Sequence, residues 1–217
     1  MIPPSCFDNF YEHPDSVRDF ALSLDYHSAT EDCNFPGERT LCLSTIDFNF
    51  FQYSICKLFS YFFDVDTLTN VVGNTYFQKI YPYHQQQNHP MNTGWAHIDD
   101  DVELAAVVYL NTHTCFDSGT TIVHPNDKYD DSCVDYKFRH DLYHNYPVEE
   151  KFYIESIKNH NDKFDFKSEF KNEYNRMIAY NGETWHKESS FWVPEEFRLT
   201  QVFFIKSVDS SLSKKIS

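Results

Sequence analysis

The chain has 217 residues, of which 41% are hydrophobic and 18% aromatic, so it can bury a substantial core. Its 33 acidic and 18 basic side chains give a formal charge of −15, which argues against general binding to nucleic acids or anionic membranes. No segment approaches the roughly 20 uninterrupted apolar residues that a transmembrane helix requires.

The first part of the chain, residues 1–70, is expected to form a mainly helical N-terminal support. Between Pro14 and Leu24, apolar residues recur at helical spacing. Residues 50–63 are predicted to form a second helix, with apolar side chains gathered on one side: Phe51, Ile55, Leu58, Phe59 and Phe62.

Short strand patterns separated by turn residues dominate residues 71–206. The candidate strands are 75–81, 94–99, 104–110, 120–123, 176–180 and 199–206. Such a series indicates a sandwich or barrel. The metal ligands argued below must converge from strands far apart in sequence, which favours a double-stranded β-helix (jelly roll). The predicted fold class is therefore mainly β with flanking helices.

A polar, charged stretch interrupts these strands at 125–175. We interpret it as an insertion near the mouth of the barrel, with helices expected at 149–158 and 167–175. Residues 207–217 are expected to form a tail. The chain is predicted to be one domain, 1–217, since no repeat, low-complexity tract or flexible linker divides it.

Three His-x-Asp triplets occur, and their surroundings distinguish them. Pro14 places the first triplet, 13–15, at the start of a helix, where its side chains suit capping. The third, 160–162, lies in a polar stretch and is expected to be solvated. Only His97-Ile98-Asp99 is followed by an apolar strand. On an extended strand, residues two apart point to the same side, so His97 and Asp99 can reach one metal ion.

His186 supplies a suitable third ligand downstream, in strand-like surroundings. Two histidines and one carboxylate on one face of a metal suit a non-haem Fe(II) oxygenase, whose other positions stay open. Arg198 offers a fixed cation for the far carboxylate of 2-oxoglutarate, with two parallel hydrogen bonds that lysine cannot reproduce. Strand alternation places Thr200 on the same face, where its hydroxyl can bind the same carboxylate.

The ordered set of motifs resembles the Fe(II)/2-oxoglutarate-dependent dioxygenases, in particular the prolyl 4-hydroxylase-like group and its small bacterial and phage-type proteins. The resemblance rests on His97-x-Asp99, the strand ending at Asn111, the turn 118–121, and His186 followed by Arg198. The segments 7–21 and 35–37 also resemble that subgroup. One departure is Ser118-Gly119, where relatives usually carry two glycines.

The resemblance implies an enzyme that uses Fe(II), 2-oxoglutarate and O2 to hydroxylate a C–H bond, with release of succinate and CO2. His97, Asp99 and His186 would be the metal and catalytic residues, and Arg198 and Thr200 would bind 2-oxoglutarate. Related enzymes often add a tyrosine from the strand before the metal motif. Tyr76, Tyr81 and Tyr83 are candidates, of which we select Tyr81. The substrate is expected to be a peptide, an amino acid or another small molecule.

Two other functions stay open. The same ligand set would serve a metal-binding jelly roll that has lost turnover and acts as a sensor or scaffold. The run from His140 to His144 resembles the His-Glu-x-x-His motif of zinc peptidases. However, aspartate replaces its glutamate, and Pro147 would end the helix soon afterwards. Halogenation is disfavoured because relatives with that activity lack the carboxylate that Asp99 provides.

The N-terminal residues lack the basic and apolar parts of a secretory signal, and the six cysteines contain no Cys-x-x-Cys pair. We therefore expect a cytoplasmic protein with reduced cysteines. No feature of the sequence predicts its oligomeric state.

Overall fold

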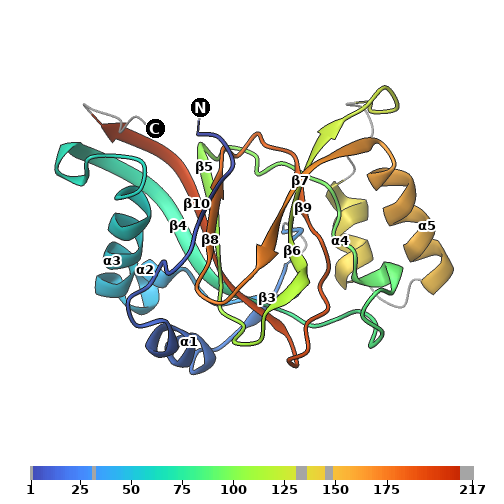
Figure 1. Cartoon of the computed structure of the whole chain (residues 1–217), viewed down its shortest axis with the longest axis horizontal. Coiled ribbons are helices and arrows are strands. Elements are labelled where there is room, and N and C mark those ends of the chain that lie inside the picture. The colour runs from blue at the N-terminus through green and yellow to red at the C-terminus, as the bar shows by residue number, and fades with distance from the viewer. Residues whose placement is uncertain (1, 31–32, 131–135, 145–148, 211–217) are drawn as a thin grey trace.

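The computed structural model describes residues 2–30, 33–130, 136–144 and 149–210. Two antiparallel sheets face each other, one helical layer covers the outer side of the larger sheet, and a second helical group lies beyond the smaller sheet (Figure 1). This arrangement confirms the predicted mainly β jelly roll with flanking helices. Within the described ranges, no helix is both long and apolar enough to cross a membrane.

The N-terminal helices are α1 (Pro14–Leu22), α2 (Leu43–Ile46) and α3 (Phe48–Phe59). Proline opens α1, and the Asp47 side chain caps α3 by accepting a hydrogen bond from the Phe50 amide. Their apolar faces pack on the large sheet in the main core cluster, which includes the buried Phe10, Phe59 and Phe203. The predicted helical support is thus observed, together with three short strands.

The large sheet has the strand order β1-β8-β5-β10-β4-β3-β2. Its long central strands, β4 (Leu68–Ile80) and β10 (Arg198–Ser210), pair antiparallel, with Arg198 opposite Ile80 and Thr200 opposite Gln78. The other members are β1 (Ser5–Phe7), β2 (His27–Ser28), β3 (Glu38–Arg39), β5 (Leu104–Tyr109) and β8 (Met177–Tyr180). Strand β10 runs through Ser210, into the segment expected as a tail; residues 211–217 lie outside the described residues.

The small sheet has the order β7-β6-β9, formed by β6 (Cys115–Pro125), β7 (Phe164–Asn172) and β9 (His186–Glu188). Residues 94–99 run beside β9 but form only an isolated bridge, between His97 and His186. Two short 3-10 turns, Val65–Thr67 and Pro90–Asn92, precede this segment. The strand predicted at 94–99 is therefore reduced to a single paired residue.

The segment predicted as an insertion holds two helices, α4 (Tyr136–His144) and α5 (Glu150–Asn161). Their buried side chains form a separate apolar cluster with Trp95 and Phe191. The helix predicted at 167–175 is wrong, because this stretch belongs to β7 and pairs with β6. The helical part of the segment thus ends at Asn161, and the chain then returns to the small sheet.

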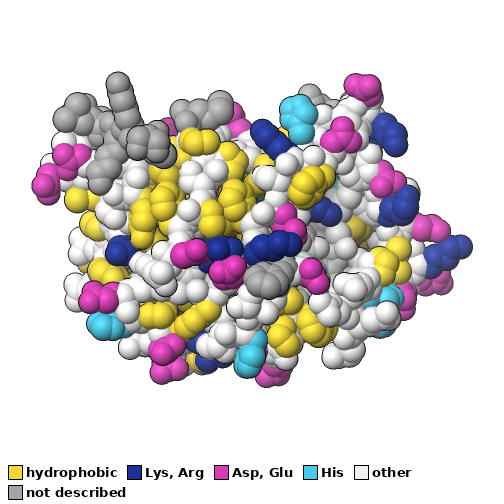
Figure 2. All heavy atoms as spheres, viewed as in Figure 1, with side chains coloured by type: hydrophobic (Ala, Val, Ile, Leu, Met, Phe, Trp, Pro, Cys, Tyr) yellow, Lys and Arg dark blue, Asp and Glu magenta, His cyan; other side chains and the backbone are white. Residues whose placement is uncertain are grey.

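Charged side chains of both signs are mixed on the face in Figure 2, among exposed hydrophobic side chains. The apolar residues exposed over a large fraction of their surface include Phe166 on β7 and Phe48 at the start of α3.

Candidate metal centre

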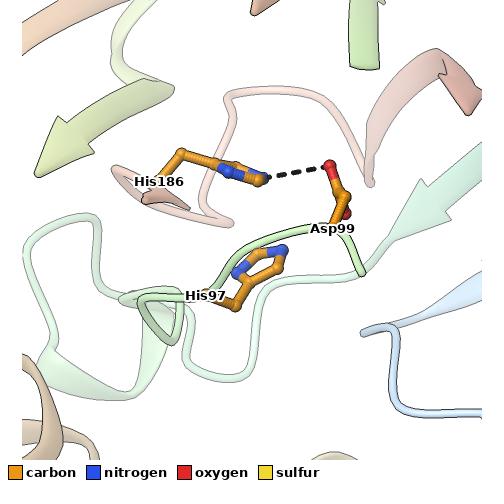
Figure 3. Close-up of side chains that lie close together, drawn as sticks. All are labelled: His97, Asp99 and His186. Carbon is orange, nitrogen blue, oxygen red and sulfur yellow. Dashed lines mark ion pairs between the residues drawn. The ribbon is translucent and has the colours of Figure 1, made fainter. Parts of the chain in front are cut away.

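His97, Asp99 and His186 converge where residues 94–99 run beside β9 (Figure 3). One ligand atom from each residue lies within 4.8 Å of the others. Nε2 of His186 is 3.7 Å from a carboxylate oxygen of Asp99, and the two imidazole centroids are 4.3 Å apart. Of the described residues, only these three form such a group. Two nitrogens and one oxygen at this spacing fit a divalent metal such as Fe(II).

The backbone sets the orientation of both imidazole rings. Nδ1 of His97 donates to the Trp95 carbonyl at 2.7 Å, and Nδ1 of His186 donates to the Thr184 carbonyl at 2.8 Å. Each ring thereby carries its proton on Nδ1 and turns an Nε2 lone pair toward the centre, as a metal ligand requires.

Burial also keeps the ligands in a suitable protonation state. Desolvation lowers the pKa of His97 well below its usual value, and the nearby charges of Arg139 and His186 lower it further. The imidazole is therefore neutral near pH 7 and available to a metal. Desolvation raises the pKa of Asp99, while His186, Arg39 and Arg139 oppose that rise. A bound cation would favour the carboxylate form.

The segment that carries His97 is held on both of its edges. On one edge, His97 and His186 exchange backbone hydrogen bonds at 2.9 Å, and the Asp99 amide donates to the Gly182 carbonyl. On the other edge, Asn161 accepts from the Ala96 amide and donates to the Gly94 carbonyl, while His160 donates to the Ala96 carbonyl at 2.7 Å.

This contact corrects the expectation of a solvated triplet at 160–162 for His160 and Asn161, while Asp162 is exposed as expected. His160 is only 5% exposed, and its ring stacks on Trp95 at 3.9 Å. The helix end thus takes the place of a further strand, which explains why 94–99 forms so little regular sheet.

Arg198 lies on β10, 3% exposed, in a narrow cavity behind the three ligands. Its Nε donates to the Ser118 carbonyl at 3.0 Å, and its guanidinium lies 5.3 Å from the centre of the Tyr109 ring. No described carboxylate forms an ion pair with it. The neighbouring Thr200 is fully buried, and its hydroxyl has no hydrogen-bond partner. A buried cation beside an unsatisfied hydroxyl is a receptor for an anionic group.

A wider cleft of about 700 Å³ adjoins two of the ligands, His97 and Asp99. His97 and Asp99 line both spaces, as do Arg39, Glu188 and Phe204. The inner cavity is small, about 50 Å³, and so suits the end of an extended chain better than a bulky group. All three ligands thus share the inner cavity with Arg198, and two of them also border the outer cleft.

The structure does not bring Tyr81 to this site. Gln78 and Ile80 face Thr200 and Arg198 across the strand pair, so the even-numbered residues of β4 point toward the cavity. Tyr81 is odd-numbered and points to the other side; it is 44% exposed and packs on Phe197. Tyr76 is even-numbered and lines the outer cleft. Tyr83 is enclosed among aromatic rings, including Tyr143 and Phe191.

The polar residues that line the two spaces and were not predicted include Arg39, Gln78, Arg139 and Glu188. Strand alternation could have indicated two of them, because Glu188 follows His186 by two residues and Gln78 lies opposite Thr200. Arg39 and Arg139 come from β3 and α4, and no local pattern in the sequence relates them to the ligands.

The histidines of the peptidase-like run lie apart from this centre, on α4. Their ring centroids are 5.0 Å apart, and Nε2 of His144 hydrogen-bonds to the Phe35 carbonyl at 2.6 Å. Within the described chain, no third ligand joins them in a metal-binding group. The zinc-peptidase alternative therefore has no assembled site.

Solved structures share this fold. HygX from Streptomyces hygroscopicus, solved with nickel and 2-oxoglutarate bound, is 12% identical; the match covers 93% of this chain and 82% of HygX, with a TM-score of 0.56. HygX with nickel, 2-oxoglutarate and hygromycin B gives 13% identity, the same coverage and a TM-score of 0.55. A 2OG-Fe(II) oxygenase family oxidoreductase from Burkholderia pseudomallei is 13% identical; the match covers 93% of this chain and 83% of that protein, with a TM-score of 0.47.

The two HygX structures confirm, at the level of the fold, the resemblance to 2-oxoglutarate-dependent oxygenases. No curated protein sequence matches the chain significantly. The chain belongs to the family of unknown function DUF6445, whose model matches residues 3–199.

Proposed function

We propose that this protein is an Fe(II)- and 2-oxoglutarate-dependent oxygenase that hydroxylates a C–H bond of an amino acid, a peptide or another small molecule. In this reaction one oxygen atom of O2 enters the substrate as a hydroxyl group, and the other enters succinate as 2-oxoglutarate loses CO2. The observation that carries the proposal is that the three ligands share a cavity with the buried Arg198, which pairs with no described carboxylate, while His97 and Asp99 also border an open cleft.

His97, Asp99 and His186 would hold the iron, which supplies the site for O2 activation. All three lie on the two chain segments that meet at the His97–His186 bridge, so they would bind the metal from one side and leave room for the co-substrate and O2.

Arg198 would bind the far carboxylate of 2-oxoglutarate. Its Nε is already committed to the Ser118 carbonyl, so the other guanidinium nitrogens can donate to the ligand. The hydroxyl of Thr200 would add a further bond and gain the partner that it lacks. HygX, whose structure holds nickel and 2-oxoglutarate in a similar fold, is consistent with this assignment.

The direct test is an anaerobic titration of the purified protein with Fe(II) and then 2-oxoglutarate, followed through the visible metal-to-ligand charge-transfer band. We expect a band that needs both additions and is lost in His97→Ala. His140→Ala is the matched control, because it removes a buried histidine outside the centre and should keep the band.

Iron binding that survives simultaneous replacement of His97 and Asp99 by alanine would contradict the proposed ligands. Iron binding without a band in the unmodified protein would favour the sensor or scaffold function. Loss of metal in His140→Ala alone would return the peptidase motif to consideration.

A further inference from the structure

The outer cleft carries charges that the proposed use of iron and 2-oxoglutarate does not employ. Two arginines and a glutamate lie in its wall beside the metal ligands, namely Arg39, Arg139 and Glu188. Two more charged residues, Asp100 and Lys206, stand at its exposed rim.

Arg39 is held in a fixed position at the wall. Its guanidinium lies 4.1 Å from the centre of the Phe35 ring and 4.9 Å from that of Phe204. Its Nε and Nη2 both donate to Oε1 of Gln78, at 3.3 and 3.2 Å. Nη1 is left for a ligand, since no described carboxylate forms an ion pair with this arginine. Aromatic contacts and a single neutral acceptor orient the cation without neutralising it.

Arg139 reaches the cleft from α4 and is even less solvated. It is 5% exposed, and its Nε is buried without a hydrogen-bond partner. The nearest aromatic support is Tyr143, whose ring centre is 5.7 Å from the guanidinium. In the part of the chain that the structure describes, no carboxylate pairs with it. A buried cation with an unsatisfied donor is costly unless a ligand completes it.

Glu188 provides the opposite charge in the same wall. It follows His186 by two residues on β9, so both side chains point to the interior. Its Oε2 is buried and has no hydrogen-bond partner. Arg39 responds to both of the other charges: burial lowers its pKa to about 10, the charges of Asp99 and Glu188 oppose this change, and that of Arg139 adds to it.

We propose that the substrate is a zwitterionic small molecule, an amino acid or a close relative, whose carboxylate binds Arg39 and Arg139 and whose ammonium group lies beside Glu188. This proposal rests on the proposed oxygenase function. It follows from two arginines without an ion pair among the described residues, and one unsatisfied carboxylate oxygen, in a cleft that adjoins the metal ligands. A dianion would place its second negative charge near Glu188, and a neutral molecule would leave all three groups unsatisfied.

The test uses the full chain, loaded anaerobically with Fe(II) and 2-oxoglutarate. Each of the proteinogenic amino acids is added, together with its methyl ester and its N-acetyl derivative. Binding is measured by the shift of the charge-transfer band and by the melting temperature. We expect at least one free amino acid to bind, and its ester and N-acetyl derivative to bind at least about tenfold more weakly, as the loss of one charged contact implies.

Three variants assign the contacts. Arg39→Gln and Arg139→Gln should each weaken the binding of the amino acid about tenfold or more. Glu188→Gln should instead reduce the preference for the free amine over the N-acetyl derivative. Arg18→Gln is the matched control, because it removes an arginine that pairs with Glu195 outside the cleft and should leave amino-acid binding unchanged.

If the band forms but no amino acid binds, the zwitterion proposal is overturned and the oxygenase proposal stands. Equal binding of acid and ester, or full binding by both arginine variants, would also overturn it. If no band forms, the oxygenase proposal fails, and the substrate proposal fails with it.

Discussion

At the scale of single residues, the centre is organised by short-range contacts. Each histidine ligand donates its Nδ1 proton to the carbonyl of the residue two positions before it. The segment that carries each histidine therefore also fixes its ring, and the sequence pattern was enough to predict that His97, Asp99 and His186 come together. Arg39 and Arg139 depend on long-range folding, so residue chemistry could not assign them to this centre.

Arg198→Ala should weaken the binding of 2-oxoglutarate and leave the affinity for Fe(II) nearly unchanged. A charge-assisted hydrogen bond contributes about 1.5–3 kcal/mol, so we expect the dissociation constant for 2-oxoglutarate to rise about 10- to 150-fold. Thr200→Val removes only a neutral contact and should raise the dissociation constant for 2-oxoglutarate no more than about tenfold. Anaerobic titration with Fe(II) and then 2-oxoglutarate, followed through the charge-transfer band, measures the dissociation constants of both ligands. An equal loss of iron affinity in Arg198→Ala would show that the arginine supports the metal centre itself.

His160 should make stability depend on pH. Burial lowers its pKa in the folded protein from 6.5 to about 4, so the unfolded chain binds more protons between these values. This contribution is fully present above pH 6.5 and is lost as the pH falls toward 4, at up to about 1.4 kcal/mol per pH unit. Urea unfolding of the metal-free protein from pH 4 to 7.5 should show a shallower slope for His160→Gln. Parallel curves for the two proteins would rule this contribution out.

At the scale of elements, most strands and both long N-terminal helices could be predicted, because apolar residues recur in each at the spacing of a strand or a helix. Residues 167–175 were predicted to be helical, because their lysines and glutamates favour a helix. A period of two was present nevertheless, since Phe164, Phe166 and Phe170 lie at even positions of β7. Pairing with β6 overrides the local propensity. The contact between the end of α5 and residues 94–96 leaves no periodic signal in the sequence, because the side chains of His160 and Asn161 bind backbone groups.

Gly119 allows β6 to pass close to β7, and Gly119→Ala should destabilise the small sheet. A Cβ there would lie 1.8 Å from the Phe170 carbonyl oxygen, so the backbone would have to shift. Overpacking of this kind costs about 1–3 kcal/mol. The shift would also move the Ser118 carbonyl that orients Arg198, so 2-oxoglutarate binding should weaken too. Phe166→Ala on β7 is the control: its side chain is 70% exposed, and stability should change by about 0.5 kcal/mol or less. Urea denaturation measures the free energy of unfolding of both variants. An unchanged free energy of unfolding in Gly119→Ala would contradict the close contact between β6 and β7.

At the scale of the whole molecule, metal and co-substrate should stabilise the fold together, since the centre joins the two sheets. A ligand at 100 times its dissociation constant adds about 2.7 kcal/mol, which corresponds to about 5–11 °C in a chain of this size. We expect Ni(II) with 2-oxoglutarate to raise the melting temperature by more than Ni(II) alone. His97→Ala should abolish both increases in differential scanning fluorimetry. An increase by 2-oxoglutarate that does not depend on metal would place its binding elsewhere.

The shared wall between the inner cavity and the outer cleft has a kinetic consequence. Arg39, Glu188 and Phe204 border both spaces, so a molecule seated in the cleft also covers the approach to Arg198. Catalysis would then follow a compulsory order, in which 2-oxoglutarate enters first and succinate departs last. An excess of substrate would trap the enzyme before its co-substrate arrives, and turnover would fall as the substrate concentration rises beyond its optimum.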